Sequence, residues 1–173
     1  MTGLLTDTEI KQQRALGDIA IEPFDGRQLS SNSYDVRLGE WYYRETEHEE
    51  SIYNPRDEAS VARAWGKPQK AMRAGDWMTQ QGKELAGIDP EERIIWIGPG
   101  ESLLAHTQEF IGFRRNGVTS MQARSSFGRS FLVACSCAGT PDKKSHYCVF
   151  FLIAYMLTNS SCVPVTTLSR LGG

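Results

Sequence analysis

Short runs of strand-forming residues, separated by turns that contain Gly or Pro, recur through most of the chain. The clearest pair is Arg93–Ile97 and Ser102–Thr107, which flank the turn Gly98-Pro99-Gly100. Together with a single helix at the start, this pattern predicts a mainly β fold, a barrel or roll. The other predicted strands are Asp18–Ile21, Ser33–Leu38, Val118–Met121, Phe131–Cys137 and Tyr147–Leu157.

The predicted helix has signals at both of its ends. Thr6 and Glu9 have the spacing of a capping box, and Leu5 and Ile10 stand at the positions of a hydrophobic staple. Gly17 follows as the C-terminal stop. We therefore expect a short helix that begins just after Thr6 and ends before Gly17.

The 173 residues suit a single domain, with two unusual stretches in it. Residues 44–92 are the most polar part, although Trp65 and Trp77 interrupt them. No Pro-, Ser- or Gly-rich tract isolates this stretch, so it is interpreted as an insertion with some local structure. The tail, residues 143–173, contains three basic residues and no Asp or Glu, because all 21 acidic residues lie in 1–142.

Charge and hydropathy exclude two classes of partner. A formal net charge of −2 argues against a basic surface for nucleic acid. The longest apolar run, Tyr147–Leu157, is about half the ~20 residues that a membrane-spanning helix needs. The N-terminus has no basic and apolar regions of a signal peptide. We expect a cytoplasmic protein without a membrane partner.

The four cysteines have two interpretations. Cys135, Cys137, His146 and Cys148 could form a metal-binding set, but reduced and buried thiols are favoured. The zinc deaminase signature is incomplete, because His48-Glu49-Glu50 fits its H-x-E half and nothing fits its P-C-x-x-C half. We therefore predict no zinc site. For His106 we expect a structural hydrogen bond.

The segment Arg124-Ser125-Ser126-Phe127-Gly128-Arg129 carries the most chemistry in the sequence. Its guanidinium groups can bind phosphate oxygens, its hydroxyls can donate, and its Gly allows an anion to approach the backbone. By pattern alone such a run is more often a surface turn than a binding site, and it matches neither a P-loop nor a dinucleotide fingerprint. Asp142, which follows a Gly- and Pro-containing stretch, is by itself typical of a turn.

Several motifs, in order along the chain, resemble the dCTP deaminase family. They cover about residues 1–43 and 93–142, and residues 44–92 resemble a longer loop found in some members. The motifs are Leu5-Thr6-Asp7, Gly17-Asp18-Ile19, Ile21-Glu22-Pro23-Phe24, Asn32-Ser33-Tyr34-Asp35-Val36-Arg37-Leu38-Gly39, Gly98-Pro99-Gly100-Glu101, Leu104-Ala105-His106-Thr107-Gln108-Glu109-Phe110-Ile111-Gly112, Arg124-Ser125-Ser126-Phe127-Gly128-Arg129 and Ala138-Gly139.

The resemblance implies the distorted β-barrel of trimeric dUTPases, assembled as a homotrimer with sites between subunits. It implies zinc-independent deamination of dCTP to dUTP and ammonia in dUTP and dTTP biosynthesis, with Mg²⁺ carried on the triphosphate and dUTP or dTTP as further candidate ligands. The implied site residues are Arg124, Ser125 and Ser126 at the triphosphate and the attacking water, Gly128 in a tight turn, Arg129 beside the catalytic carboxylate, the backbone of Ser136 and Ala138 at the base, and Asp142 near the deoxyribose.

One position departs from the family. Where the family has its catalytic Glu, ten residues after the aspartate matched by Asp142, this chain has Leu152, and no Asp or Glu follows Asp142. Leu cannot carry the proton that a general acid–base must transfer. Three hypotheses account for this: a tail translated out of frame, a nucleotide-binding subunit without catalysis, or a dUTP diphosphatase that uses Asp142 as its base.

Overall fold

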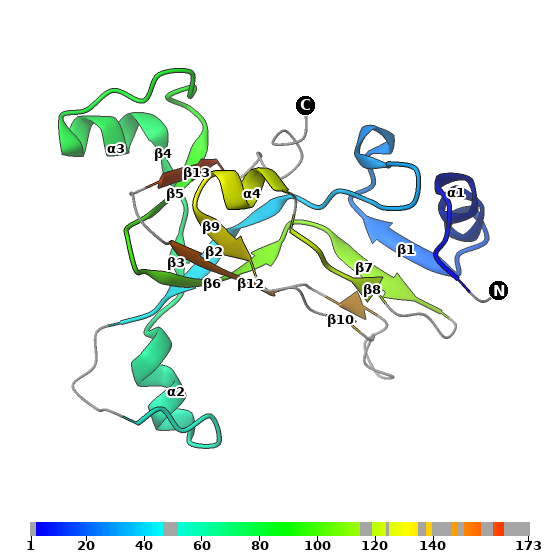
Figure 1. Cartoon of the computed structure of the whole chain (residues 1–173), viewed down its shortest axis with the longest axis horizontal. Helices are drawn as coiled ribbons and strands as arrows, with labels where there is room; N and C mark the ends of the chain where they lie inside the picture. Colours follow the sequence, from blue (N-terminus) through cyan, green and yellow to red (C-terminus); the bar gives the residue numbers. More distant parts are fainter. Residues whose placement is uncertain are drawn as a thin grey trace.

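The computed structural model describes residues 3–46, 52–114, 119–123, 125–134, 138–139, 147–148, 151–156 and 161–164. These residues form a mainly antiparallel β structure with a short N-terminal helix, which confirms the predicted fold class (Figure 1). The helices are α1 (Asp7–Ala15), the 3₁₀ helix η1 (Gly26–Gln28), α2 (Glu58–Trp65), α3 (Ala74–Gln81) and α4 (Ser125–Arg129).

The strands form four small sheets, and all of their pairings are antiparallel. The largest has the order β3 (Gln69–Lys70), β2 (Leu38–Arg44), β6 (Ser102–Thr107), β12 (Phe151–Met156) and β9 (Leu132–Ala134). The others are β13 (Ser161–Pro164), β5 (Arg93–Ile97) and β4 (Met72–Arg73); β1 (Ile19–Glu22), β7 (Phe110–Phe113) and β11 (Tyr147–Cys148); and β10 (Ala138–Gly139) with β8 (Thr119–Ser120).

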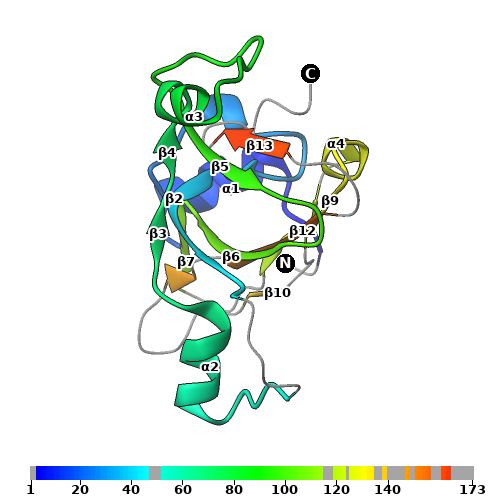
Figure 2. The same ribbon diagram turned by 90° about the vertical axis from the view of Figure 1, so that its left-hand side faces the viewer.

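Two sheets enclose the main core. Strands β2, β6 and β9 of the five-stranded sheet and strand β5 of the β13–β5–β4 sheet all contribute to one buried cluster, around which the strands curve in Figure 2. Burial of such side chains is the main favourable term in folding, at about 25 cal/mol per Å² of apolar surface. The cluster consists of Leu38, Tyr42, Ala71, Ile95, Ile97, Leu103, Ala105, Phe127 and Leu132.

Helix α1 has the ends that the sequence predicts. The Thr6 backbone N–H donates to Glu9 Oε2 at 2.8 Å, and the Glu9 N–H donates to Thr6 Oγ1 at 3.3 Å, which completes the capping box. Gly17 follows the helix with φ 74°, a left-handed conformation that Gly adopts without strain. Ile10 packs this helix onto a second core cluster formed with Ile19, Ile21 and Ile111.

The strand predicted over Ser33–Leu38 is wrong for all but its last residue, since β2 begins at Leu38. The backbone groups of residues 33–37 instead form hydrogen bonds with the side chains of Gln28 and Glu109 and with the backbone of nearby loops. The Asp35 carbonyl accepts from Gln28 Nε2 at 3.0 Å, and the Arg37 N–H donates to Glu109 Oε2 at 2.7 Å. Tyr34 adds only an isolated bridge to Leu29. These partners take the backbone groups that a strand ladder would need.

Other predicted strands differ in length. Strands β5 and β6 match their predicted ranges. Strand β9 lies within the predicted Phe131–Cys137, of which residues 135–137 are outside the described residues, and Tyr147–Leu157 contains two strands, β11 and β12. Strands β7 and β13 were not predicted. Strand β7 is four residues long and includes a Gly, so its pattern is too short to stand out in the sequence.

The insertion expected over residues 44–92 has local structure, as predicted, with α2, β3, β4 and α3 inside it. Figure 1 shows α2 and α3 at the opposite end of the molecule from α1. Trp77 of α3 is 5% exposed and its ring lies 4.5 Å from that of Trp96 on β5, in a third core cluster with Ala74 and Ile94.

Between β3 and β4, Ala71 joins two sheets. Its N–H donates to the Glu40 carbonyl of β2 at 2.8 Å, and its carbonyl accepts from the Arg93 guanidinium of β5 at 2.8 Å. Ala71 is itself buried, at 2% exposure. None of the helices in these described ranges is long and apolar enough to cross a membrane.

Candidate functional site

A single aromatic side chain fixes helix α4 on the β structure. Phe127 is 4% exposed and lies in the main core cluster with Leu132, which belongs to the strand that follows the helix. Ser125, Gly128 and Arg129 are exposed on the same short helix. The core therefore holds the helix in place while a hydroxyl and a guanidinium face the solvent.

The guanidinium of Arg129 is exposed on α4. Its side chain forms no hydrogen bond or ion pair with any other described residue. A guanidinium presents paired N–H donors that match two oxygens of a phosphate group. Anion binding by this motif stays a prediction, for which the exposed Arg129 supplies a suitable donor.

The tight turn expected at Gly128 is not there. Gly128 lies inside α4, and a Cβ added to it would meet no atom within 4 Å. The left-handed residue is Phe131, with φ 62°, two residues after the helix ends. The Ser130 and Phe131 N–H groups close the helix by donating to the carbonyls of Phe127 and Gly128, at 3.0 and 3.1 Å. Residues 125–129 therefore form a short helix that a turn follows, rather than the surface turn that the pattern favours.

The remaining predicted site residues are only partly covered by the structure. Ser126 lies in α4, where only its backbone is described, and Ala138 pairs with Ser120 between β10 and β8. That pairing places Ala138 beside the segment that leads into α4. Arg124, Ser136 and Asp142 lie outside the described residues.

Leu152, which occupies the position of the family's catalytic Glu, lies on a strand inside the five-stranded sheet. It belongs to β12, between β6 and β9, and its register partner on β6 is Ala105, which is 3% exposed. The strand expected from the family resemblance is therefore present. Its residue at this position has no titratable group, so it cannot transfer a proton.

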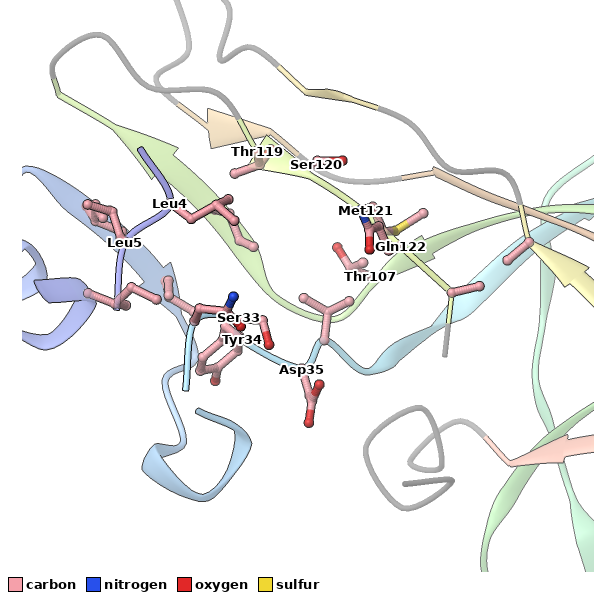
Figure 3. A pocket seen from close by; sticks show the side chains of 18 of the residues that line it. Leu4, Leu5, Ser33, Tyr34, Asp35, Thr107, Thr119, Ser120, Met121 and Gln122 are labelled. Atoms are coloured by element: carbon pink, nitrogen blue, oxygen red, sulfur yellow. The ribbon is translucent and has the colours of Figure 1, made fainter. Parts of the chain in front are cut away.

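A cavity of about 570 Å³ lies next to α4 (Figure 3). Its walls come from the start of the chain, β1, β7, residues 32–38 and residues 119–123, and it reaches Phe127. Most of the lining is apolar, as is usual for small-molecule sites. The apolar lining includes Leu5, Ile10, Ile19, Ile21, Val36, Leu38, Ile111, Phe113 and Met121.

Polar side chains lie between these apolar walls. Among the described residues that line the cavity none is Lys or Arg, and Asp35 is the one carboxylate among them. The described lining therefore suits an uncharged ligand group better than a phosphate. The polar lining residues are Asn32, Ser33, Tyr34, Asp35, His106, Thr107, Thr119, Ser120 and Gln122.

Hydrogen bonds on both sides hold Tyr34 in this wall. Its hydroxyl accepts from the Asp25 N–H at 2.9 Å and donates to Gln28 Oε1 at 3.0 Å. Burial raises the pKa of Tyr34, which outweighs the opposing effect of the hydrogen bond from Asp25. The phenol therefore stays protonated near neutral pH.

His106 makes the structural hydrogen bond expected from the sequence. Its Nδ1 lies 2.7 Å from the Thr107 carbonyl oxygen. Its ring occupies the space above Gly39, where an added Cβ would come within 2.5 Å of Nδ1 and 2.6 Å of Nε2. The isolated Gly within the strand-like run after Leu38 was the signal for this close approach, because Gly in a strand often marks one.

No group of three or more His, Cys, Asp or Glu side chains in the described part of the chain is arranged to hold a metal ion. The cysteine and histidine set considered from the sequence is not covered by that statement. Cys135, Cys137 and His146 lie outside the described residues, and only the backbone of Cys148 is described.

The chain matches known proteins along most of its length. Residues 4–158 match the family model described as dCTP deaminase-like, a range that continues past Asp142 and includes Leu152. The dCTP deaminase (dUMP-forming) of Beutenbergia cavernae is 27% identical over 140 residues, which are 80% of this chain and 62% of that protein. The dCTP deaminase of Aeropyrum pernix is 28% identical over 127 residues, 73% of this chain and 58% of that protein.

A solved structure, that of 2′-deoxycytidine 5′-triphosphate deaminase from Agrobacterium tumefaciens, has a similar fold. Its TM-score is 0.57 at 14% sequence identity, over 95% of this chain and 46% of that one. This likeness supports the fold. The chain spans about three fifths of the length of the curated relatives above. Because the family match covers far more than half of its residues, the chain belongs to the dCTP deaminase-like family.

Proposed function

We propose that the chain binds dCTP and catalyses its hydrolytic deamination to dUTP and ammonia, a step in the biosynthesis of pyrimidine deoxynucleotides. The observation that carries the proposal is the family match over residues 4–158, which includes Ser125 and Arg129, both exposed on α4. Relatives from Beutenbergia cavernae and Aeropyrum pernix, both named as dCTP deaminases, support it.

Charge and exposure on α4 support a role in binding the triphosphate. Ser125 and Arg129 would contact phosphate oxygens, because both are exposed on a helix that the core holds in place. Mg²⁺ would enter with the triphosphate, since this ion prefers phosphate and water oxygens. On the family resemblance we further propose that Arg124 and Ser126 join the phosphate site, that Ser136, Ala138 and Asp142 contact the nucleoside, and that the protein is a cytoplasmic homotrimer.

The reaction requires a proton carrier. The oxygen of water adds to C4 of cytosine while one water proton moves to N3 of the ring. The second water proton, from the new C4 hydroxyl, then moves to the amino group, ammonia leaves from C4, and the C4 carbonyl of uracil forms. Leu152 stands where the family has the glutamate for this transfer. A missing general acid–base typically costs about 10²–10⁴-fold in rate. We therefore expect dCTP binding of ordinary strength and turnover lower than in the family by about that factor.

A second candidate is formation of dUMP, which would add release of pyrophosphate to the deamination. The relatives from Beutenbergia cavernae and Methanosphaerula palustris are named as dUMP-forming dCTP deaminases. Hydrolysis of the triphosphate by this chain would involve Asp142 as the base, as in the dUTP diphosphatase hypothesis.

Three products separate these activities. The purified chain is incubated with dCTP or dUTP and Mg²⁺, and ammonia, dUTP and dUMP are quantified. Ammonia with dUTP supports the deaminase, ammonia with dUMP supports the dUMP-forming reaction, and dUMP from dUTP alone supports the diphosphatase. The control is Arg129→Ala, which should lose nucleotide binding while remaining folded. Saturable dCTP binding without any product would overturn the enzymatic proposal and leave a nucleotide-binding subunit.

A further inference from the structure

The cavity and the exposed face of α4 differ in the ligand chemistry that they offer. Arg129 supplies an exposed guanidinium on α4 with no side-chain partner among the described residues, whereas the described lining of the cavity holds apolar walls, amides, hydroxyls, one imidazole and one carboxylate. Ala123 and Phe127 belong to the cavity lining and stand directly before and within α4. A ligand with one charged and one uncharged part could therefore occupy both places at once.

The imidazole of His106 is held with one nitrogen available for a ligand. A carbonyl oxygen can only accept a hydrogen bond, so the contact with Thr107 requires the proton on Nδ1. In the neutral ring Nε2 is then the acceptor. No described residue forms a hydrogen bond with Nε2.

Two features of β2 create the space for this ring. Gly39 has no side chain to collide with it, and the register between β2 and β6 shifts between the pairs Leu38–Thr107 and Tyr42–Ala105. Such irregularities in sheets re-aim side chains and are frequent beside functional sites. The His106 ring is thus placed in the cavity wall by the backbone of both strands.

We propose that this cavity takes the uncharged nucleoside part of the ligand, and that His106 Nε2 accepts a hydrogen bond from it. The proposal rests on the proposed function, because α4 would then hold the phosphates of the same molecule.

The chemistry of the lining favours a pyrimidine nucleoside over a purely apolar ligand. Small-molecule pockets span about 300–1,000 Å³ and combine apolar walls with a few polar groups, as this cavity does. The amides of Asn32 and Gln122 can donate to a carbonyl oxygen and accept from an amino group. The exocyclic amino group of cytosine is a donor that suits the acceptor nitrogen of His106.

The test measures binding of 2′-deoxycytidine, which has no phosphate, by saturation-transfer NMR and calorimetry. We expect saturable binding to the wild type and a five- to tenfold weaker affinity for His106→Ala, the usual effect of losing one hydrogen bond. His106→Gln places an amide near the position of Nε2, and it should recover part of the loss. Arg129→Ala is the matched control, and it should weaken dCTP binding but leave deoxycytidine binding unchanged.

Two results would overturn the inference: no saturable deoxycytidine binding to a folded wild type, or equal affinities for the wild type and His106→Ala. If His106→Ala loses its thermal unfolding transition, the test rests on His106→Gln alone. A purely structural role of His106 predicts that folded His106→Gln binds deoxycytidine as tightly as the wild type does, whereas the inference predicts weaker binding. Deoxycytidine binding through His106 in a chain that releases no ammonia would support this inference and contradict the proposed deaminase. Normal dCTP turnover with equal deoxycytidine affinities would do the reverse.

Discussion

Glu109 is completely buried and holds Arg37 with both of its carboxylate oxygens. Oε1 accepts from Arg37 Nε at 2.7 Å, and Oε2 accepts from the Arg37 backbone N–H at 2.7 Å. The two residues are 72 positions apart, and their contact fixes the entry into β2 against the turn between β6 and β7. Gln28 Nε2 lies 3.5 Å from Oε1 and completes the surroundings.

Removal of the Arg37 guanidinium should destabilise the protein strongly. Arg37→Met keeps most of the stem but leaves the Glu109 carboxylate buried without its ionic partner, which typically costs about 3–5 kcal/mol. The free energy of unfolding in urea measures this loss. The control is Lys11→Ala, which breaks the exposed pair with Asp7 at 3.3 Å and should leave the stability nearly unchanged, because solvent screens this pair. Equal effects of the two variants would contradict a structural role for the buried pair.

A methyl group at Gly39 should destabilise the fold through His106. The added Cβ overlaps the imidazole ring, so the ring or strand β2 must shift, and overpacking of this kind costs about 1–3 kcal/mol. In the background of His106→Ala the same substitution should cost much less, because the ring is gone. Urea unfolding of the two single variants and the double variant gives the coupling energy.

Gly128→Ala is the matched control for that experiment. Gly128 lies in α4 with open space around it, so Ala should stabilise the helix by about 0.5–1 kcal/mol. A loss of stability at Gly128, or additive effects at Gly39 and His106, would show that the described contacts do not govern these positions.

Phe131 is in a conformation that suits glycine better. Its φ of 62° is left-handed, and its side chain is 45% exposed, so more than half of the side chain is buried. The left-handed conformation costs about 1–2 kcal/mol for residues with a Cβ, so Phe131→Gly relieves strain that offsets part of the burial it loses. Phe131→Gly should therefore lower the melting temperature less than Val133→Gly does. Differential scanning calorimetry checks this, with Val133→Gly, a strand position of similar exposure, as the destabilised control.

A carboxylate at position 152 should raise the rate of deamination. Leu152→Glu supplies the proton carrier that the proposed reaction lacks, and it should increase ammonia release from dCTP by about 10²–10⁴-fold. The control is Leu152→Gln. The Gln side chain has nearly the same shape as Glu but no titratable group, so this variant should deaminate dCTP at the rate of the wild type. Equal rates for the two folded variants would exclude this position as the site of proton transfer.

Asp25 links stability to acid pH. Hydrogen bonds from the side chain and the backbone of Arg27 lower the pKa of Asp25 to about 2. A depressed pKa in the folded state gives stability that is fully present above the unfolded value near 4 and is lost as the pH falls through about 2. Urea unfolding of the wild type should therefore weaken over this pH range more than that of Asp25→Asn. Parallel pH profiles for the two proteins would contradict the assignment.

The sequence predicts well those helices and strands whose ends are set by residues only a few positions away. The capping box of Thr6 and Glu9 sets the start of α1, and the turn Gly98-Pro99-Gly100 separates β5 from β6 within their predicted ranges. Their partners lie within a few residues, so a short stretch of sequence contains the whole signal.

The elements that the sequence predicts poorly depend on distant partners. Residues 33–37 alternate like a strand, yet Gln28 and Glu109 take their backbone groups. Glu109 resembles any surface charge in the sequence, and nothing near it indicates a partner 72 residues away. Helix α4 contains Ser and Gly, which disfavour helices, and it forms because Phe127 is buried in the core.

The position of Ala71 limits how the polar insertion can vary. Residues 69–73 cover one edge of the five-stranded sheet with β3 and one edge of the β13–β5–β4 sheet with β4. Uncovered strand edges are templates for pairing with other chains. Helix α2 could therefore be lengthened, shortened or exchanged without uncovering these edges, whereas α3 is tied to β5 through Trp77 in the third core cluster. A deletion that reached Ala71 would expose two edges at once and favour aggregation over a smaller functional fold.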